Sequence, residues 1–230
     1  RQQDGEAALF LIDELEQLLA DYQDASRNQQ QIKELRSRLD LIRAEIFALS
    51  GNIDYAEVLL AQAKTSFAEA HNVQGVGDAW IIDATLAVSV GDSPREAQAC
   101  QHALDAYQRG DDQRRIAFAE AWRIYELSFS NPIAAKSALA EFVQYCQFLN
   151  QPEIAAHIAA AEGVIDGKRD PAYAAKHYLS ASHLAISCGL QRLAIVSAGN
   201  ACEAFQGIDD LDSATHAIEL AMKLAKQAKW

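Results

Sequence analysis

Apolar and polar positions along this chain follow a helical period that is interrupted at regular intervals. Turn-forming residues fall near positions 51, 72, 91, 110, 130, 150, 168, 189 and 208, about every twenty residues. Between these breaks the apolar residues recur with the spacing of one helical face, and no stretch shows the alternation of a strand. Alanine, the best helix former, is abundant. The pattern predicts an all-helical chain built from short helices.

The four prolines mark where several helices begin. Each follows a polar residue, in the pairs Ser93–Pro94, Asn131–Pro132, Gln151–Pro152 and Asp170–Pro171. Proline is tolerated at the first helical position because its missing N–H would have no partner there. A Ser, Asn or Asp before it supplies an oxygen that caps the helix, and Ser93 to Glu96 also has the spacing of a capping box. We expect a helix to begin at each proline.

The turns also define a repeat. Gly51, Gly91, Ser130, Lys168 and Gly207 are separated by 40, 39, 38 and 39 residues. An alanine follows each turn, at positions 56, 97, 135, 175 and 214, and a larger apolar residue comes one helical turn later at Leu60, Leu139, Leu179 and Ile218, with Gln101 as the exception. A small residue at a fixed point lets two helices approach closely. Helix hairpins of this kind bury their apolar faces by stacking on one another.

The chain resembles the tetratricopeptide repeat family. Besides the alanines, the resemblance is carried by small residues in first helices (Ala44, Gly163, Cys202) and by aromatic residues three positions later (Phe47, Phe205). It implies an all-α fold, an α-solenoid of about five antiparallel helix pairs. A capping helix within residues 1–27 would precede a repeat domain over 28–230, with repeats near 30–72, 73–110, 111–150, 151–189 and 190–230. The chain departs from the family in its longer repeat, near 39 residues rather than 34, and in repeats two and three, which lack the small-then-aromatic pair.

Long, degenerate repeats of this kind are similar to those of bacterial signalling proteins. They resemble the sensor regions that precede diguanylate cyclase (GGDEF) domains and those of LuxR-type transcription activators, and the final segment "LAKQAKW" resembles a helix that continues into a cyclase domain. The resemblance implies a regulatory sensor domain that acts on an attached output domain through ligand binding or dimerisation. The alternative is a stand-alone scaffold or adaptor that binds protein partners.

No motif points to catalysis or to a cofactor. The sequence contains no nucleophile elbow, phosphate-binding loop or dinucleotide fingerprint. The stretch "GVGDAW" from Gly75 to Trp80 is interpreted as a flexible loop between repeats, capped by Asp78. The closest histidines, His177 and His183, are six residues apart, so their rings do not share a helix face as a metal pair would. We expect no enzyme, no cofactor and no metal site.

The charge of the chain limits the classes of partner that we expect, and its cysteines indicate the compartment. The net charge is −12, from 32 acidic and 20 basic residues, and neither nucleic acid nor an anionic membrane is expected to attract such a chain. No apolar run is long enough to span a bilayer. The four cysteines form no CxxC pair, which favours free thiols in a reducing compartment and hence the cytoplasm.

The resemblance implies a concave groove lined by the first helix of each pair. Its register carries over to inward-pointing Glu45, Asp83, Glu120, Asn200 and Glu203, with Ala117, Ala159, Val196 and Gly199 between them; the alternative is that these are solvated surface positions. Because these positions are acidic or small, the groove suits a basic or amphipathic helix. It does not suit the acidic C-terminal peptides held by a carboxylate clamp. We also expect Trp80 and Trp122 in the core, and a homodimer formed through terminal repeats.

Overall fold

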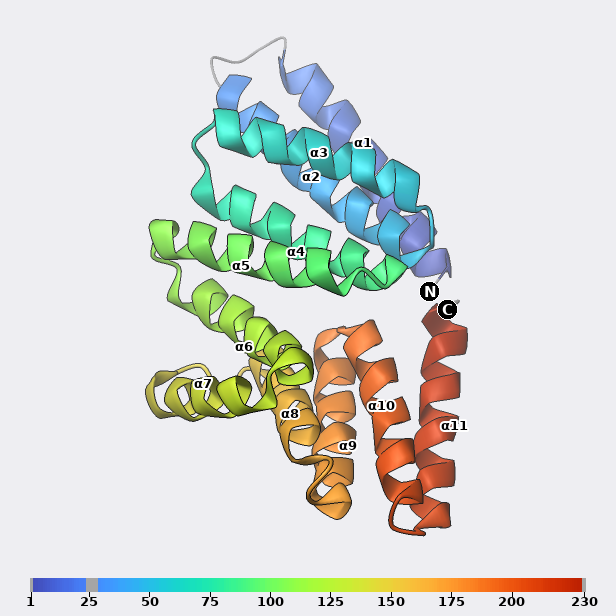
Figure 1. The fold of residues 1–230 in the computed structure, drawn as a ribbon. Helices are drawn as coiled ribbons and strands as arrows, with labels where there is room; N and C mark the ends of the chain where they lie inside the picture. Colours follow the sequence, from blue (N-terminus) through green and yellow to red (C-terminus); the bar gives the residue numbers. More distant parts are fainter. Residues whose placement is uncertain (1, 24–28, 229–230) are drawn as a thin grey trace. The chain divides into compact units, whose positions relative to one another are not determined.

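The computed structural model describes residues 2–23 and 29–228, and every regular element in this part is a helix (Figure 1). The elements are α1 (Gln2–Gln23), α2 (Gln29–Leu49), α3 (Ile53–Glu69), α4 (Val73–Val90), α5 (Ser93–Gly110), α6 (Gln113–Ser130), α7 (Pro132–Tyr145), α8 (Pro152–Asp166), α9 (Pro171–Cys188), α10 (Gln191–Gln206) and α11 (Leu211–Ala228). None of these helices is long and apolar enough to cross a membrane.

The helices pack as neighbours along the chain. Two compact units can be distinguished, Arg1–Asp112 and Gln113–Trp230. In the first, α2 pairs with α3 and α4 with α5; in the second, α6 pairs with α7, α8 with α9 and α10 with α11. Short turns join the members of each pair, which therefore run antiparallel. The predicted fold class, an all-α solenoid-like stack of helix pairs, is confirmed.

Helices begin at the predicted prolines, with one shift in the capping residue. The side chains of Asn131 and Asp170 accept hydrogen bonds from the backbone N–H groups of Ala134 and Tyr173 at 3.1 and 3.0 Å. At Pro94, however, the capping residue is Asp92, which accepts from the N–H of Arg95 at 3.1 Å. Ser93 is the first residue of α5, so the predicted capping box there is wrong by one residue.

The same one-residue shift explains the exception in the second repeat. Ala56, Ala135, Ala175 and Ala214 are buried between helices, whereas Ala97 is exposed. The place equivalent to Ala56, 40 residues on, belongs to the buried Glu96, and Cys100 occupies the place of Leu60. The predicted small residue at 97 and the exception at Gln101 therefore come from a single register error of one residue. With the register corrected, both places in the second repeat hold a buried residue.

The glycine-rich stretch is helical rather than a loop. Gly75 and Gly77 lie in the first turns of α4 and are buried, and the helix is capped by Asn72, which accepts from the N–H of Gly75 at 2.8 Å. Asp78 accepts instead from the hydroxyl of Tyr107 at 2.8 Å. The interpretation as a flexible loop capped by Asp78 was wrong, because packing against neighbouring aromatic rings outweighs the low helix propensity of glycine.

Candidate functional site

A cavity of about 380 Å³ lies between α6 and α7 in the second unit. Its walls come from one face of each helix and from the segment that follows α7: Gln113, Ile116, Ala117, Glu120, Arg123, Ala138, Glu141, Phe142, Tyr145, Cys146, Gln147 and Phe148. The positions on α6 recur at three- and four-residue spacing, as do those on α7, so each set shares a helix face.

The cavity exists because α7 packs only over its first half. The helix is 14 residues long against 18 for α6, and its buried residues are Ala135 and Leu139. Further along α7, Ala138 and Phe142 are only half-buried and line the cavity. Tyr145, at its last position, is 74% exposed. The gap that a well-packed hairpin would fill is therefore open to a ligand.

The charges in the cavity leave a net negative site. Arg123 donates from Nε and from its second amino nitrogen to the two oxygens of Glu120, at 2.9 and 2.6 Å. These bonds raise the pKa of Arg123 and neutralise both groups. Glu141 is exposed on the α7 wall, and among the described residues it has no cationic partner. Phe142, Tyr145 and Phe148 add aromatic surface beside it.

The opposite side of α6 is anchored in an aromatic core. Trp122 is buried, as predicted, and stacks on His157 of α8 with ring centroids 5.3 Å apart and planes 29° apart. Phe118 meets the same imidazole edge to face at 5.4 Å. The Nδ1–H of His157 donates to the carbonyl of Glu153 at 2.8 Å. Burial lowers the pKa of His157 to about 4, so the ring is neutral at pH 7. The helix that forms this wall of the cavity is thus packed, on its opposite face, against buried aromatic rings.

The five predicted groove residues occupy different environments. Glu45 on α2 and Glu203 on α10 are exposed, and Asn200 on α10 is half-buried. Glu120 lines the α6–α7 cavity together with Ala117, one of the four predicted wall residues. Of the other three wall residues, Ala159 is buried, and Val196 and Gly199 are half-buried. Glu45 and Asp83 belong to the first unit, and the other three predicted residues belong to the second. That all five line a single groove stays a prediction.

Asp83 lies in a buried ion network. Its carboxylate, 5% exposed as a residue, accepts from Nε of Arg95 at 2.7 Å and from Lys64. The ammonium of Lys64 also lies 3.3 Å from the ring centroid of Trp80. Arg95 in turn reaches Glu57 at 2.7 Å. The network joins α3, α4 and α5, and it satisfies the carboxylate of Asp83 within the first unit.

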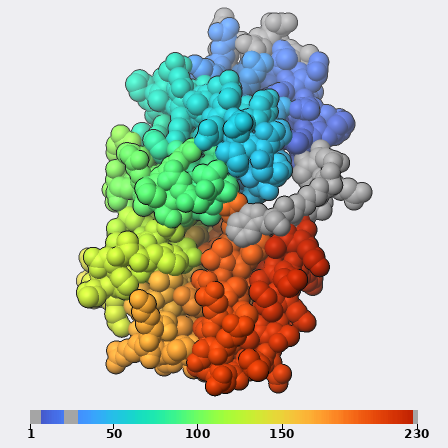
Figure 2. Space-filling model, turned by 45° about the vertical axis from the view of Figure 1, so that its right-hand side comes forward, coloured from blue at the N-terminus to red at the C-terminus, as the bar shows by residue number. Residues whose placement is uncertain are grey.

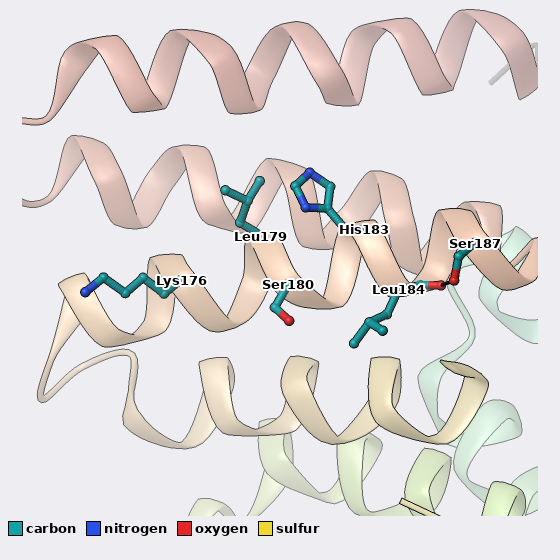
Figure 3. Close-up of a pocket in the computed structure, with 6 residues that line it drawn as sticks. All are labelled: Lys176, Leu179, Ser180, His183, Leu184 and Ser187. Carbon is teal, nitrogen blue, oxygen red and sulfur yellow. Dashed lines mark hydrogen bonds between the residues drawn. The ribbon is translucent and has the colours of Figure 1, made fainter. Parts of the chain in front are cut away.

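A shallow groove on α9 is the other hollow of note (Figure 3). It encloses about 540 Å³ and is lined by side chains of that one helix: Lys176, Leu179, Ser180, His183, Leu184 and Ser187. A wall from a single helix offers a ligand contacts on one side only. The α6–α7 cavity has walls from two helices and is lined by charged and aromatic side chains, so it is the better candidate site.

Sequence reasoning missed the α7 side of this cavity. The family register draws attention to first helices, whereas Glu141, Phe142 and Tyr145 stand on a second helix. The available signal was the aromatic cluster in "EFVQYCQF", which is dense for a helix end. Within the described ranges no group of three or more His, Cys, Asp or Glu side chains is placed to hold a metal ion.

Comparison with known proteins supports the fold. No model of a known protein family and no curated protein matches the chain. Among solved structures, the chain is similar to the crystal structure of BtubC (BKLC) from P. vanneervenii, with a TM-score of 0.60 and 14% sequence identity over 97% of this chain and 92% of that chain. At this identity the likeness extends to the fold alone, an all-helical repeat-like architecture.

Proposed function

We propose that this chain is a non-catalytic protein-interaction module, similar to tetratricopeptide repeats, whose α6–α7 cavity binds a basic or amphipathic segment of a protein partner. The observation that carries the proposal is Glu141. It is an exposed carboxylate without a cationic partner in the described part of the chain, on the wall of a cavity whose one cation, Arg123, is already engaged by Glu120.

The aromatic residues make the cavity suited to the side chains of Lys and Arg. Phe142, Tyr145 and Phe148 line the cavity near Glu141. An aromatic face attracts a guanidinium or ammonium group, and the alkyl stem of Lys or Arg packs on apolar surface while its charge stays at the rim. Ile116 and Ala138 provide apolar surface for a neighbouring Leu or Val of the same segment. The cavity therefore suits a helix that presents apolar and basic residues on one face.

The overall charge supports the same partner class. With a net charge of −12, the protein attracts basic segments over longer distances than the charges of the cavity alone would. Such attraction raises the association rate and is weakened by salt.

A finer proposal is that this binding regulates an attached output domain, such as a diguanylate cyclase or the DNA-binding domain of a LuxR-type activator. It rests on the resemblance of the repeats to those signalling proteins. Reading the parent gene beyond codon 230 tests it: an in-frame cyclase or helix-turn-helix domain supports regulation in cis, and an immediate stop codon supports a stand-alone adaptor.

The binding proposal is tested with two fluorescent helical peptides of equal length, one built from leucine and lysine and one from leucine and glutamate. Fluorescence anisotropy should show saturable binding of the lysine peptide and none of the glutamate peptide. Glu141→Lys should weaken binding by at least about tenfold, which corresponds to about 1.4 kcal/mol.

The matched control is Asp105→Lys, the same change of charge at an exposed position on α5 in the first unit. It should leave the affinity close to wild type at moderate salt. Equal loss in both variants would show attraction by net charge alone and would contradict a site at Glu141. Full retention of binding in Glu141→Lys would contradict it as well.

A further inference from the structure

The last helix pair exposes a position that the earlier pairs bury fully or in part. Leu60 and Cys100, and then Leu139 in the second unit, are buried at this point of the repeat. Leu179 is half-buried and packs against the core formed by α10 and α11. Ile218, the equivalent residue of α11, is 40% exposed. The repeat thus places an apolar residue at this point of each pair, and on α11 no described helix covers it.

Ile218 belongs to a continuous apolar stripe. Leu211 is seven residues before it and Met222 four residues after it, so the three side chains share one face of α11. All three are exposed, Leu211 by 65% and Met222 by 53%. The neighbouring face of α11, which includes Ala217 and Leu224, is buried against α10. Figure 2 shows α11, in red, along the outer edge of the second unit. We call Leu211, Ile218 and Met222 the α11 stripe.

The first helix presents a matching face. Leu11, Leu15 and Leu18 are spaced by four and three residues, so they also share one helix face, and each is about half exposed or more. Arg43 of α2 holds the other side of α1 through Asp13, at 2.6 Å, and Glu16. This arrangement turns the three leucines, the α1 stripe, away from α2.

The acidic α1 and the C-terminal end of α11 carry opposite charges. The 22 residues of α1 include six acidic residues and no Lys or Arg. Glu14, beside the α1 stripe, is exposed and makes no ion pair among the described residues. On α11, the exposed Asp212 and Glu219 lie beside Leu211 and Ile218, whereas the exposed Lys223 and Lys226 follow Met222 and make the C-terminal end of the helix basic. An acidic amphipathic helix is therefore the natural complement of the basic end of α11.

We propose that the occupant of the α11 stripe is the α1 helix of a second copy of this chain. The contact joins the head of one molecule to the tail of another and extends the stacking of helices across copies. Such a contact is heterologous, so each pair keeps one free α1 stripe and one free α11 stripe, and growth continues unless a ring closes.

Sedimentation velocity over a wide range of concentration tests the proposal on residues 1–230. The wild-type chain should pass from monomer to dimer and larger species, and added salt should shift it toward monomer. A tail variant, Ile218→Glu with Met222→Glu, and a head variant, Leu15→Glu, should each be monomeric. Exposed Ile133 of α7 provides the matched control, and Ile133→Glu should associate as wild type does. Circular dichroism checks that every variant keeps its helix content.

Mixing the two monomeric variants separates head-to-tail pairing from symmetric pairing. The head variant keeps its α11 stripe and the tail variant keeps its α1 stripe, so the mixture should form a 1:1 dimer and nothing larger. Glu14→Lys and Lys226→Glu should each weaken association, and the double variant should recover it. A wild-type chain that is monomeric at all concentrations, a head variant that still dimerises, or a mixture that stays monomeric would each overturn the proposal.

Discussion

The ring of Tyr107 on α5 lies directly against Gly77 on α4. It fills the space that the Cβ atom of any larger residue at position 77 would occupy. A Cβ atom at position 77 would lie 2.3 Å from Cε1 and 2.6 Å from Cδ1 of the ring. Tyr107 cannot easily withdraw, because it is fully buried and its hydroxyl donates to Asp78 at 2.8 Å. Gly75 is in the same situation with the ring of Phe67. The two glycines permit α4 to pack closely on the helices beside it.

Gly77→Ala should therefore destabilise the protein, although alanine is the better helix former. Helix propensity alone would favour alanine by about 1 kcal/mol, whereas overpacking a buried contact costs roughly 1–3 kcal/mol. We expect a net loss in the free energy of unfolding, measured by urea denaturation. Gly199→Ala in α10 is the control, because a Cβ there meets no atom within 4 Å. That variant should be as stable as wild type or more so, and an equal loss in both would contradict the packing argument.

This contact also shows which features were predictable from sequence. Proline and its capping residue act locally, so helix starts at Pro132 and Pro171 could be read directly. The helix through Gly75 and Gly77 depends on rings 8 and 30 residues away, at Phe67 and Tyr107, and local propensity does not contain that information. The resemblance to helical repeats indicated the architecture but not these contacts.

The candidate site was predictable only in part for a similar reason. Glu120 follows from the repeat register, because that register describes first helices. The α7 wall arises where a hairpin fails to pack along its whole length, and an absence of packing has no periodic signature in sequence. In the second repeat, Glu96 and Ala97 are both compatible with a helix, so a one-residue slip could be seen only from their burial.

The buried imidazole of His157 should make the protein sensitive to mild acid. Its pKa is about 4 in the folded chain and about 6.5 when unfolded. Between these values the unfolded state binds one more proton than the folded state, so stability falls as pH falls from about 6.5 to 4. The loss should approach roughly 3 kcal/mol at the acidic end.

Urea denaturation at a series of pH values measures this dependence. His157→Phe keeps an aromatic ring beside Trp122 but removes the titrating group, so its stability should fall less steeply over the same pH range. The absolute stability of this variant should be lower at pH 7, because the bond to the carbonyl of Glu153 is lost. A slope identical to wild type would show that other groups cause the acid sensitivity.

Removal of the Asp83 carboxylate should weaken the first unit. Asp83→Asn would leave Lys64 and Arg95, which are partly buried, without their shared anion. Breaking a buried pair from one side costs roughly 3–5 kcal/mol, and we expect the lower end because both cations retain some exposure. Thermal unfolding measures the loss. Asp105→Asn, an exposed carboxylate on α5, should change stability by less than about 0.5 kcal/mol.

The four free thiols report on both the core and the cavity. Cys100 and Cys202 are buried, whereas Cys146 and Cys188 are half-buried. Burial raises the pKa of Cys188, which lowers its thiolate fraction and slows its reaction. A thiol reagent such as Ellman's reagent should therefore modify Cys146 first in the native protein, Cys188 more slowly, and the other two only after unfolding.

Because Cys146 lines the α6–α7 cavity, a bound partner should shield it. The leucine–lysine peptide, at saturating concentration, should slow modification of Cys146 by at least about tenfold, the factor by which a well-occupied site reduces its free fraction. The rate at Cys188, on α9, should not change, and a Cys146→Ser variant identifies which thiol is observed. Equal protection of both thiols would indicate general stabilisation of the fold. Since only occupation of the cavity protects Cys146 selectively, this measurement places a bound peptide between α6 and α7 without any substitution in the site.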